Sequence, residues 1–343
     1  MGVRPSPEPS ELYVRQTVMK ELGKAGQQRL RSARVVVVGL GGLGSISSMY
    51  LALAGVGFLR LVDQDTVESH NLHRQSLFTV DDIRQPKAEA AANRIRKMAP
   101  FSKVEAVVEN LRSSNAEGLL GDVDLMVDGL DNMRTRYVLN SYSVRSHKPY
   151  IYGAAIAMEG NASVFHPPET PCLRCITPGV DDSTLSTCET RGVLGPTAGT
   201  IGSIQAMEAI KLIAGIRGGL EGRLLTCDLQ SMDFYAIRIS KRPDCDVCGS
   251  GIRKRIETER LTWLCGSNTV NVNPPEPLKI DLLSAADALS QKYQVLFRSP
   301  VMVVLRLQDG IEVSLFSQGR MLIKNIKSEE EALRTQERLL SLI

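Results

Sequence analysis

Four of the seven cysteines in this chain form a pattern that is typical of a metal site. Cys172 and Cys175 lie in the sequence PCLRC, and Cys245 and Cys248 lie in DCDVC. Two Cys-x-x-Cys pairs supply four soft thiolate ligands at the spacing that structural Zn²⁺ sites use. One such pair alone could be a redox dithiol, but two pairs outside any apolar periodic segment favour structural zinc. Because this site would join distant segments, we expect residues from about 30 to 250 to form one compact unit.

A glycine-rich turn indicates a nucleotide site. Gly39, Gly41 and Gly44 form the motif G-x-G-x-x-G directly after the β-branched run RVVVV. In this context, backbone amides and the start of the next helix bind phosphate. Asp63 ends the next predicted strand, where a carboxylate can bind ribose hydroxyls. These features suit a nicotinamide-dependent oxidoreductase as well as an ATP-binding enzyme, and a tight turn without a ligand is the structural alternative.

Charged residues after Asp63 favour a triphosphate. Asn71, Arg74 and Gln75 lie in a polar loop, and Lys87 begins a predicted helix. A triphosphate needs more cations than a dinucleotide does, because its β- and γ-phosphates carry most of its charge. Arg74 offers a planar fork of donors, and Lys87 offers a point charge. Each of these cations alone could be a solvated surface charge, so the prediction depends on their joint placement.

A second acidic residue follows another predicted strand. The sequence DGLDN places Asp131 and Asn132 at that strand end. Asp131 could hold Mg²⁺ beside the phosphates. Its alternative role is to cap the following helix, and the two roles are compatible.

Alternating strand and helix patterns position these residues. Strand-like segments alternate with helical ones from residue 34 to residue 147, which predicts a doubly wound parallel sheet. The segment 151–167 is more antiparallel in character. We therefore expect an α/β fold with a Rossmann-like, doubly wound mixed sheet and a structural zinc site.

A small α+β module follows at the C-terminal end. Helical patterns cover 279–293 and 328–343, and strand-like patterns cover 301–307, 312–316 and 321–326. The Asn- and Pro-rich segment 266–277 resembles a linker. The expected organisation is a helical arm (1–30), an ATP-binding domain with the zinc site (31–252) and the module (253–343).

Composition limits the function classes. The 343 residues carry a net charge of +3 and no basic run, which does not indicate a nucleic-acid partner. No apolar run is long enough for a membrane helix, and the first residues lack the apolar core of a secretory signal. Three cysteines remain outside the two pairs, and this odd number favours a reducing cytoplasm.

Several of these motifs together resemble the MoeB/ThiF/HesA family, the relatives of ubiquitin-activating enzymes. The resemblance rests on YVRQ, VVGLGGLGS, DQDTVESHNLHRQ, PKAEAA, DGLDN, IGSIQAMEAIK and the paired cysteines, and it covers roughly residues 11–250. It implies an adenylyltransferase that uses ATP and Mg²⁺. Its substrate would be the C-terminal carboxylate of a ubiquitin-like or sulfur-carrier β-grasp protein ending in Gly-Gly. The implied nucleotide-binding residues are Gly41, Gly42, Asp63, Asn71, Arg74, Lys87, Asp131 and Asn132, with zinc on Cys172, Cys175, Cys245 and Cys248.

The resemblance also implies a homodimer with two sites. Arg15 in YVRQ would reach the ATP site of the partner subunit, whereas by itself it could lie on a solvated helix face. Cys188 lies in LSTCETRG. Some relatives use a cysteine at this place as a thioester or persulfide nucleophile, and others do not require it. From the residues alone, Cys188 is a nucleophile or an inert thiol, and Cys227 is buried packing. The last cysteine is Cys265, so the module cannot be a sulfurtransferase with its own persulfide cysteine.

Three functions remain open on the sequence. An adenylyltransferase with Arg15, Arg74, Lys87, Asp131 and Cys188 as its catalytic residues explains the charged positions and the paired cysteines. A conjugating enzyme or a sulfurtransferase would then be a downstream partner. An NAD-dependent oxidoreductase explains only the glycine turn and Asp63. A catalytically idle scaffold would have no need for the full set of charged residues. The module could dock a protein partner or serve only to stabilise the chain.

Overall fold

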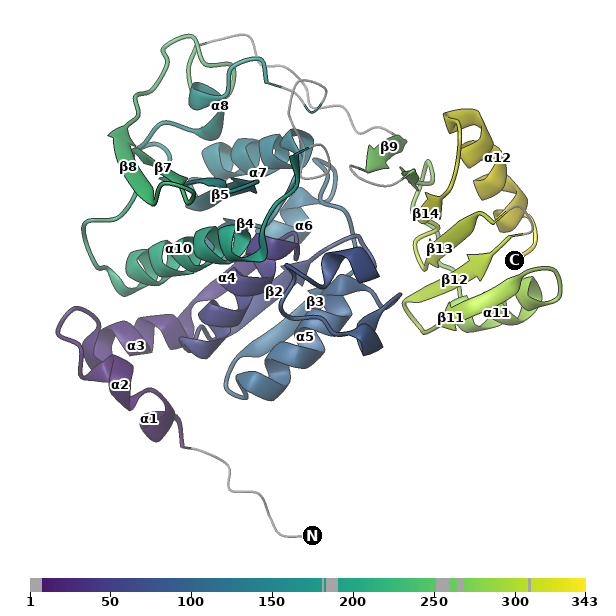
Figure 1. Cartoon of the computed structure of the whole chain (residues 1–343), viewed down its shortest axis with the longest axis horizontal. Helices are drawn as coiled ribbons and strands as arrows, with labels where there is room; N and C mark the ends of the chain where they lie inside the picture. Colours follow the sequence, from purple (N-terminus) through teal and green to yellow (C-terminus); the bar gives the residue numbers. More distant parts are fainter. Residues whose placement is uncertain (1–7, 181, 183–190, 251–259, 265–267, 308–309) are drawn as a thin grey trace. The chain divides into compact units, whose positions relative to one another are not determined.

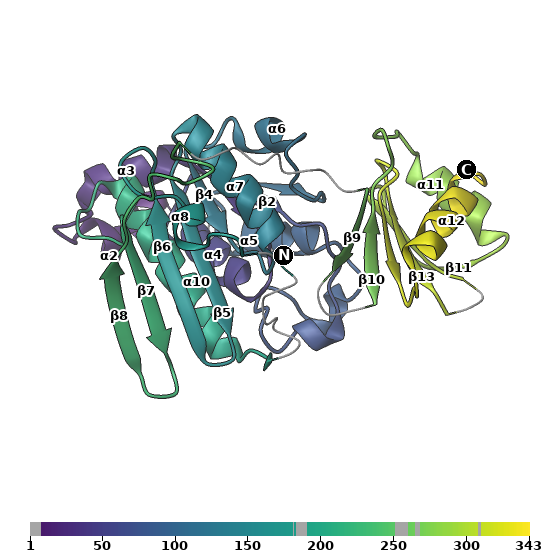
Figure 2. The same ribbon diagram turned by 90° about the horizontal axis from the view of Figure 1, so that it is seen from above.

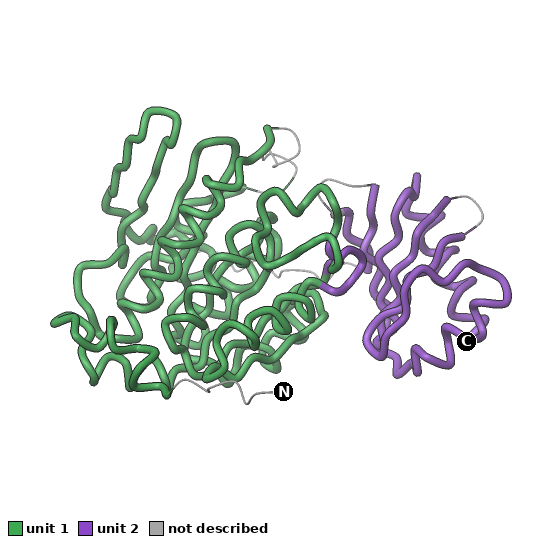
Figure 3. The backbone as a smooth tube through the Cα atoms, turned by 60° about the horizontal axis from the view of Figure 1, so that its bottom comes forward, with its two compact units in different colours: residues 1–64, 68–82, 87–256 green, residues 65–67, 83–86, 257–343 purple. Residues whose placement is uncertain are grey.

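The structure is a computed structural model that describes residues 8–180, 182, 191–250, 260–264, 268–307 and 310–343. The chain divides into two compact units (Figure 3). The larger unit comprises residues 1–64, 68–82 and 87–256, and the smaller unit comprises 65–67, 83–86 and 257–343. The boundary expected after residue 252 lies outside the described residues. Within the described part of the chain, no helix has the length and apolarity needed to span a membrane.

An eight-stranded mixed sheet forms the centre of the larger unit (Figure 1). Its strand order is β3-β2-β1-β4-β5-β6-β7-β8. Strands β3 to β5 pair in parallel, and β5 to β8 pair antiparallel. The strands are β1 (Arg34–Val38), β2 (Phe58–Val62), β3 (Lys103–Val107), β4 (Leu125–Asp128), β5 (Tyr150–Ile156), β6 (Glu159–Phe165), β7 (Arg223–Asp228) and β8 (Asp233–Arg238). The predicted α/β fold with a Rossmann-like mixed sheet is confirmed.

Helices cover both faces of this sheet, as Figures 1 and 2 show. Alternate residues of the buried strands point to opposite faces, so each strand is apolar on both sides. On one face, Val36 and Phe58 pack in a core with residues of α6 and α7. On the other face, α4, α5 and α10 pack against the strands. The helices are α1 (Pro9–Leu12), α2 (Val14–Thr17), α3 (Gly23–Ser32), α4 (Gly42–Leu53), α5 (Lys87–Met98), α6 (Ala116–Leu120), α7 (Met133–Ser146), α8 (Leu173–Ile176) and α10 (Gly195–Ala214), with 3₁₀ turns at Ser69–Asn71 and Val80–Asp82.

The strand order reverses between β1 and β4. The chain leaves β1 toward β2 and β3 on one side, and it enters β4 and β5 on the other side. Connections leave the carboxyl ends of β1 and β4 in opposite directions, which opens a crevice at that edge of the sheet. Ligands of doubly wound folds bind in this crevice. The predicted nucleotide motifs all follow the carboxyl ends of β1, β2 and β4.

The smaller unit is an antiparallel sheet with two helices. Its strand order is β11-β12-β13-β14-β10-β9. The helices α11 (Leu282–Ser290) and α12 (Glu329–Leu340) share one apolar core with the strands. The strands are β9 (Leu261–Leu264), β10 (Thr269–Val272), β11 (Gln294–Arg298), β12 (Met302–Arg306), β13 (Glu312–Phe316) and β14 (Met321–Lys324).

One expectation for the smaller unit is wrong. The segment 266–277 resembles a linker in sequence, but four of its residues form β10, an interior strand of this sheet. Val270 and Val272 are fully buried in the core, and Asn271 between them is buried as well. Asparagine is depleted in strands and proline follows at 274, so local propensity argued against a strand that tertiary packing stabilises.

Candidate functional site

The glycine turn after β1 places the start of α4 against two strand ends. Gly39 has a positive φ of 87°. A methyl group at Gly44 would lie 1.9 Å from the Gly39 carbonyl oxygen, and one at Gly129 would lie 2.1 Å from the same atom. Only glycine permits this approach, because any Cβ there would overlap a backbone atom. The Gly129 N–H also donates to the Val38 carbonyl (2.8 Å), so the turns after β1 and β4 lie side by side.

Asp63 is tied to this turn. Its carboxylate Oδ2 accepts a hydrogen bond from the Leu40 N–H at 2.7 Å, and the residue is only 8% exposed. A buried carboxylate needs such donors to remain charged. The structure therefore shows Asp63 holding the backbone of the glycine turn at the position where the sequence predicts a ribose ligand.

The polar loop after β2 packs onto the beginning of α4. A methyl group at Gly42 would lie 2.7 Å from the Ala198 Cβ and 3.4 Å from the Arg74 carbonyl oxygen. The Arg74 guanidinium donates to the Asn71 Oδ1 (2.8 Å) and to the carbonyl of His70 (3.0 Å). Asn71 is buried and Arg74 is half-buried, so these contacts fix the guanidinium beside the glycine turn.

A buried acceptor lies at the same place. Gln75 is 3% exposed, and its Nε2 lies 3.9 Å from the point where a Gly41 side chain would begin. Its Oε1 has no hydrogen-bond partner among the described residues. Lys87, the first residue of α5, is also buried, at 6% exposure. Unsatisfied or charged buried groups are uncommon away from functional sites, and Gln75 lies beside the glycine turn.

Two roles are predicted for Asp131, namely holding Mg²⁺ and capping the following helix, and its neighbour Asn132 takes the capping role. Asn132, not Asp131, is the N-cap of α7, and its Oδ1 accepts from the Thr135 N–H at 2.9 Å. The helix-capping alternative for Asp131 is therefore wrong. Asp131 is exposed, and its carboxylate accepts a bond of 3.3 Å from the Asn132 amide. Its carboxylate lies in the turn that packs against Gly39.

A buried network under this turn was missed by sequence reasoning. Asp128 is fully buried at the end of β4, and its carboxylate accepts from the Arg136 Nε (3.1 Å) and the Tyr150 hydroxyl (2.5 Å). Burial raises the pKa of Asp128, and the Arg136 charge opposes that rise. Arg136 also donates to the carbonyls of Leu130 (2.6 Å) and Gly153 (2.8 Å). The only sequence signal was the acidic residue that opens DGLDN; nothing local pairs it with Arg136.

Asp182 is a second residue that the sequence did not single out. Its carboxylate accepts from the backbone N–H groups of Met133 (2.5 Å) and Arg134 (3.2 Å). These are orphan donors at the N-terminus of α7, where the helix dipole also favours a negative charge. Cys188 lies outside the described residues. Cys227 is 1% exposed in an apolar cluster, as predicted.

Arg15 is exposed in α2, at the far end of α4 from the glycine turn. Its neighbour Gln16 donates to the carbonyl of Ala54, and the Tyr13 ring packs against Gly55. Both contacts lie after the last residue of α4, whereas Gly42 begins that helix. Twelve helical residues span about 18 Å. Arg15 therefore lies away from the crevice of its own subunit.

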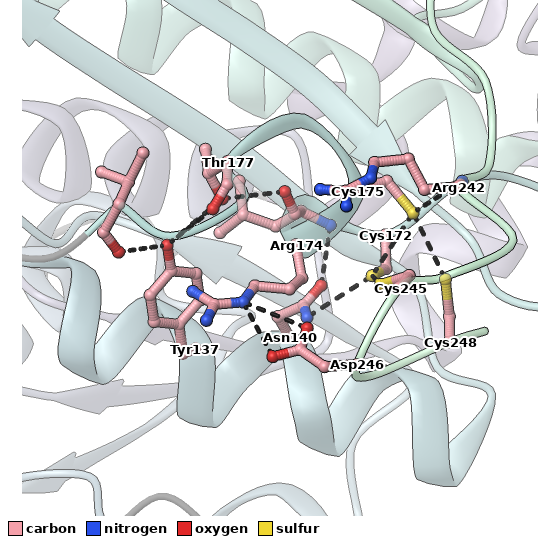
Figure 4. A network of polar contacts seen from close by, with 12 residues as sticks. Tyr137, Asn140, Cys172, Arg174, Cys175, Thr177, Arg242, Cys245, Asp246 and Cys248 are labelled. Carbon is pink, nitrogen blue, oxygen red and sulfur yellow. Dashed lines mark hydrogen bonds and ion pairs between the residues drawn. The ribbon is translucent and has the colours of Figure 1, made fainter. Parts of the chain in front are cut away.

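The four paired cysteines form one compact cluster (Figure 4). All four sulfur atoms lie within 4.8 Å of one another. The Sγ–Sγ distances are 4.0 Å for Cys172–Cys175, 3.7 Å for Cys172–Cys245 and 3.4 Å for Cys175–Cys248. A tetrahedron with metal–sulfur bonds of about 2.3 Å has edges of about 3.8 Å, so the donor set fits zinc. No position is left for a substrate, which is typical of a structural site.

Neighbouring groups orient these thiols. The Asn140 amide lies 3.7 Å from the Cys172 sulfur, and the Arg242 N–H donates to the Cys175 sulfur at 3.5 Å. Arg174 and Asp246, each inside one Cys-x-x-Cys pair, form an ion pair of 3.1 Å across the cluster (Figure 4). Burial raises the pKa of Cys248 to about 11. A bound cation would keep these four thiols, three of which are buried, deprotonated.

We expect the purified protein to contain one zinc ion per chain, measured by mass spectrometry of the metal. Cys245→Ser should remove that zinc and lower the thermal unfolding midpoint, because the two distant segments lose their common ligand. Cys227→Ser, a buried cysteine outside the cluster, is the matched control and should keep its zinc. Full zinc occupancy in Cys245→Ser would contradict the assignment.

The comparisons with known proteins agree with this geometry. The model of the ThiF family matches residues 13–247. A SAMP-activating enzyme E1 of Haloferax volcanii is 44% identical over 240 residues, which are 70% of this chain and 88% of that protein. A sulfur carrier protein adenylyltransferase of Thermus thermophilus is 40% identical over 248 residues, covering 71% of this chain and 92% of that protein.

A crystal structure of E. coli MccB with MccA-N7isoASN has the same fold. Its TM-score is 0.63 at 24% identity, and the match covers 70% of this chain and 77% of that chain. This likeness concerns the fold alone. The family match, by contrast, spans every motif on which the resemblance to MoeB/ThiF/HesA proteins rests, except the last paired cysteine, Cys248. The resemblance is confirmed: the chain belongs to the ThiF family.

Proposed function

We propose that this chain adenylates the C-terminal glycine of a ubiquitin-like or sulfur-carrier β-grasp protein. One carboxylate oxygen of that glycine attacks the α-phosphorus of ATP. The bond between this phosphorus and the oxygen that bridges the α- and β-phosphates breaks, and pyrophosphate leaves with that oxygen. The product is an acyl-adenylate. The observation that carries this proposal is the identity of 44% over 240 residues to an activating enzyme and of 40% over 248 residues to a sulfur carrier protein adenylyltransferase.

The crevice geometry supports an ATP site. The backbone of Gly41 and Gly42 begins α4, where amide groups and the helix dipole favour phosphate. We assign the ribose to Asp63 and the phosphates to Asn71, Arg74 and Lys87. Positioned cations stabilise the charge that develops on the α-phosphoryl group and on the leaving pyrophosphate.

We assign Mg²⁺ to the carboxylate of Asp131, with Asn132 holding the adjoining turn. When bound, the ion would neutralise phosphate charge and polarise the phosphoryl oxygen. Beneath it, the Arg136 bond to the Leu130 carbonyl fixes the backbone that carries Asp131. The chain's own contribution is therefore a carboxylate held at a defined place by a buried charge pair.

An NAD-dependent oxidoreductase is not favoured. The glycine turn and Asp63 suit either cofactor, but relatives of 44% and 40% identity carry the names of an activating enzyme and of an adenylyltransferase. Three cysteines lie outside the two Cys-x-x-Cys pairs, and this odd number favours a reducing compartment. We therefore propose that the protein acts in the cytoplasm. After adenylation we propose hand-over to a conjugating or a sulfur-transfer partner.

ATP–pyrophosphate exchange tests the adenylation step. Wild-type protein with a cognate β-grasp protein should incorporate labelled pyrophosphate into ATP, and an NADH absorbance assay should stay flat. Asp131→Asn should lower the exchange rate by at least about a hundredfold, because the charge that we assign to Mg²⁺ is lost. Glu169→Gln makes the same acid-to-amide change at an exposed position and should leave exchange unchanged. Normal exchange in Asp131→Asn would refute the metal assignment.

A homodimer with Arg15 acting in the partner's site predicts complementation. Arg15→Ala and Asp131→Asn should each be inactive alone, because every site lacks one group. Co-expressed with separable tags, they form mixed dimers in which one of the two sites is intact. About a quarter of wild-type exchange should then return if subunits pair at random. Continued inactivity of isolated mixed dimers would contradict the placement of Arg15 in trans.

If Cys188 forms a covalent intermediate, its replacement should abolish thioester formation without abolishing adenylation. The Cys188 thiolate would attack the adenylate carbonyl, forming a thioester and releasing AMP. Cys188→Ala should therefore keep pyrophosphate exchange but lose a conjugate that reducing agents cleave, detected on non-reducing gels. Cys265→Ala is the control and should retain the conjugate. Unimpaired downstream transfer by Cys188→Ala would discard the nucleophile.

A further inference from the structure

The chain from Leu173 to Val180 follows one face of α7. Tyr137 and Asn140 are three residues apart and therefore share a face of that helix (Figure 4). The Asn140 side-chain oxygen accepts from the Leu173 N–H at 2.8 Å, and the Tyr137 hydroxyl donates to the Val180 carbonyl at 2.7 Å. These bonds lead the chain from the cysteine cluster toward the N-terminus of α7, where Asp131 lies in the preceding turn.

Asp182 binds the first amides of α7. Its carboxylate accepts from the Met133 N–H at 2.5 Å and from the Arg134 N–H at 3.2 Å. The N-cap Asn132 accepts from the next amide, that of Thr135, at 2.9 Å. The first amides of a helix have no acceptor within the helix. Side chains therefore satisfy the first three amides of α7, and Asp182 supplies two of these bonds from a distant part of the sequence.

The Met133 amide is also the donor that Asp131 would use by itself. An aspartate side chain commonly accepts from the N–H two residues later in the chain, which forms an Asx turn. Met133 lies two residues after Asp131. In this structure the Asp182 carboxylate takes that N–H, and the exposed Asp131 carboxylate instead accepts a longer bond of 3.3 Å from the Asn132 amide. Asp182 therefore competes with Asp131 for one donor.

We propose that Asp182 is a positioning residue for adenylation, and that it acts by occupying the Met133 N–H. With this donor taken, Asp131 does not turn back onto its own helix, and its carboxylate stays available to the Mg²⁺ that accompanies ATP. An Asx turn at Asp131 would withdraw the carboxylate from the metal. Asp182 should therefore act on metal affinity rather than on turnover. This inference rests on the proposed function, which assigns Mg²⁺ to Asp131.

The Mg²⁺ dependence of pyrophosphate exchange at saturating ATP tests this role. Asp182→Ala should raise the Mg²⁺ concentration that gives half-maximal exchange by about tenfold, the factor that corresponds to one hydrogen bond with a charged group. The kcat at saturating Mg²⁺ should change little, because Asp131 is then held by the metal in both proteins. Asp182→Asn keeps an acceptor oxygen for the Met133 N–H, so its Mg²⁺ dependence should stay close to that of wild type.

A helix cap in the smaller unit provides the control for stability. Asp281 caps α11 by accepting from the Leu283 N–H at 3.1 Å. Asp281→Ala should lower the thermal unfolding midpoint, as loss of a cap does, and should leave the Mg²⁺ dependence unchanged. An unchanged Mg²⁺ dependence in Asp182→Ala, or a shift of the same size in Asp182→Asn or Asp281→Ala, would overturn the proposal.

Hydrogen exchange of the Met133 amide separates this inference from the proposed function. Measured residue by residue without nucleotide, this amide should stay protected in Asp182→Ala, because Asp131 takes over as its acceptor. It should exchange at least about tenfold faster in Asp182→Ala combined with Asp131→Ala, which removes both acceptors. Fast exchange in Asp182→Ala alone would refute the competition. If wild-type protein showed no pyrophosphate exchange, the adenylation proposal would fail, and the Met133 amide would still decide this one.

Discussion

The candidate site depends on one close approach of backbone to backbone. The Gly39 carbonyl lies so near Gly44 and Gly129 that no side chain fits at either position. This approach brings the start of α4 and the turn after β4 to the same point of the sheet edge. The backbone amides to which we assign phosphate and the residue Asp131 then lie on neighbouring turns. Glycine is the only residue that allows this, since any larger residue would separate the two turns.

Buried charge holds the crevice from below. Asp128 and Arg136 form a pair with almost no exposure, and Tyr150 and two backbone carbonyls complete its hydrogen bonds. The Gln205 amide donates to the Asp128 carbonyl from α10, so three layers of the unit meet there. A buried ion pair adds little net stability, but loss of one partner is costly because it leaves an uncompensated charge. Such a pair therefore enforces one arrangement of the turn that carries Asp131.

The cysteine cluster and the antiparallel bridge between Thr66 and Pro86 constrain two other parts of the chain. The cluster joins the segment after β6 to the segment after β8, and the Arg174–Asp246 ion pair reinforces that connection. The Thr66–Pro86 bridge joins the two ends of the crossover that carries Arg74. In both cases a few polar contacts fix segments that have little regular secondary structure. Irregular segments beside a rigid sheet are where binding residues of α/β proteins commonly lie.

Much of the fold could be predicted from the sequence, because periodicity and glycine spacing are local signals. The β-branched runs gave the strands, and the motifs after them identified Asp63, Arg74 and Asp131 as one edge of the sheet. The four cysteines were recognisable from ligand type and spacing alone. Local patterns failed at 266–277, where Asn and Pro suggested a linker and packing of Val270 and Val272 produced a strand.

Only the tertiary structure decided which residue caps the helix after β4 and which residues pair with the buried charges. Asn132 caps the helix α7, and Asp128 pairs with Arg136, eight residues later in the chain. Arg174 forms an ion pair with Asp246, which lies 72 residues later in the chain. Residue types and their spacing can be read from short stretches of the sequence, and they determine which chemistry is available. Partners of buried and half-buried charges depend on which distant segments the packed core brings together, and no short-range pattern records that.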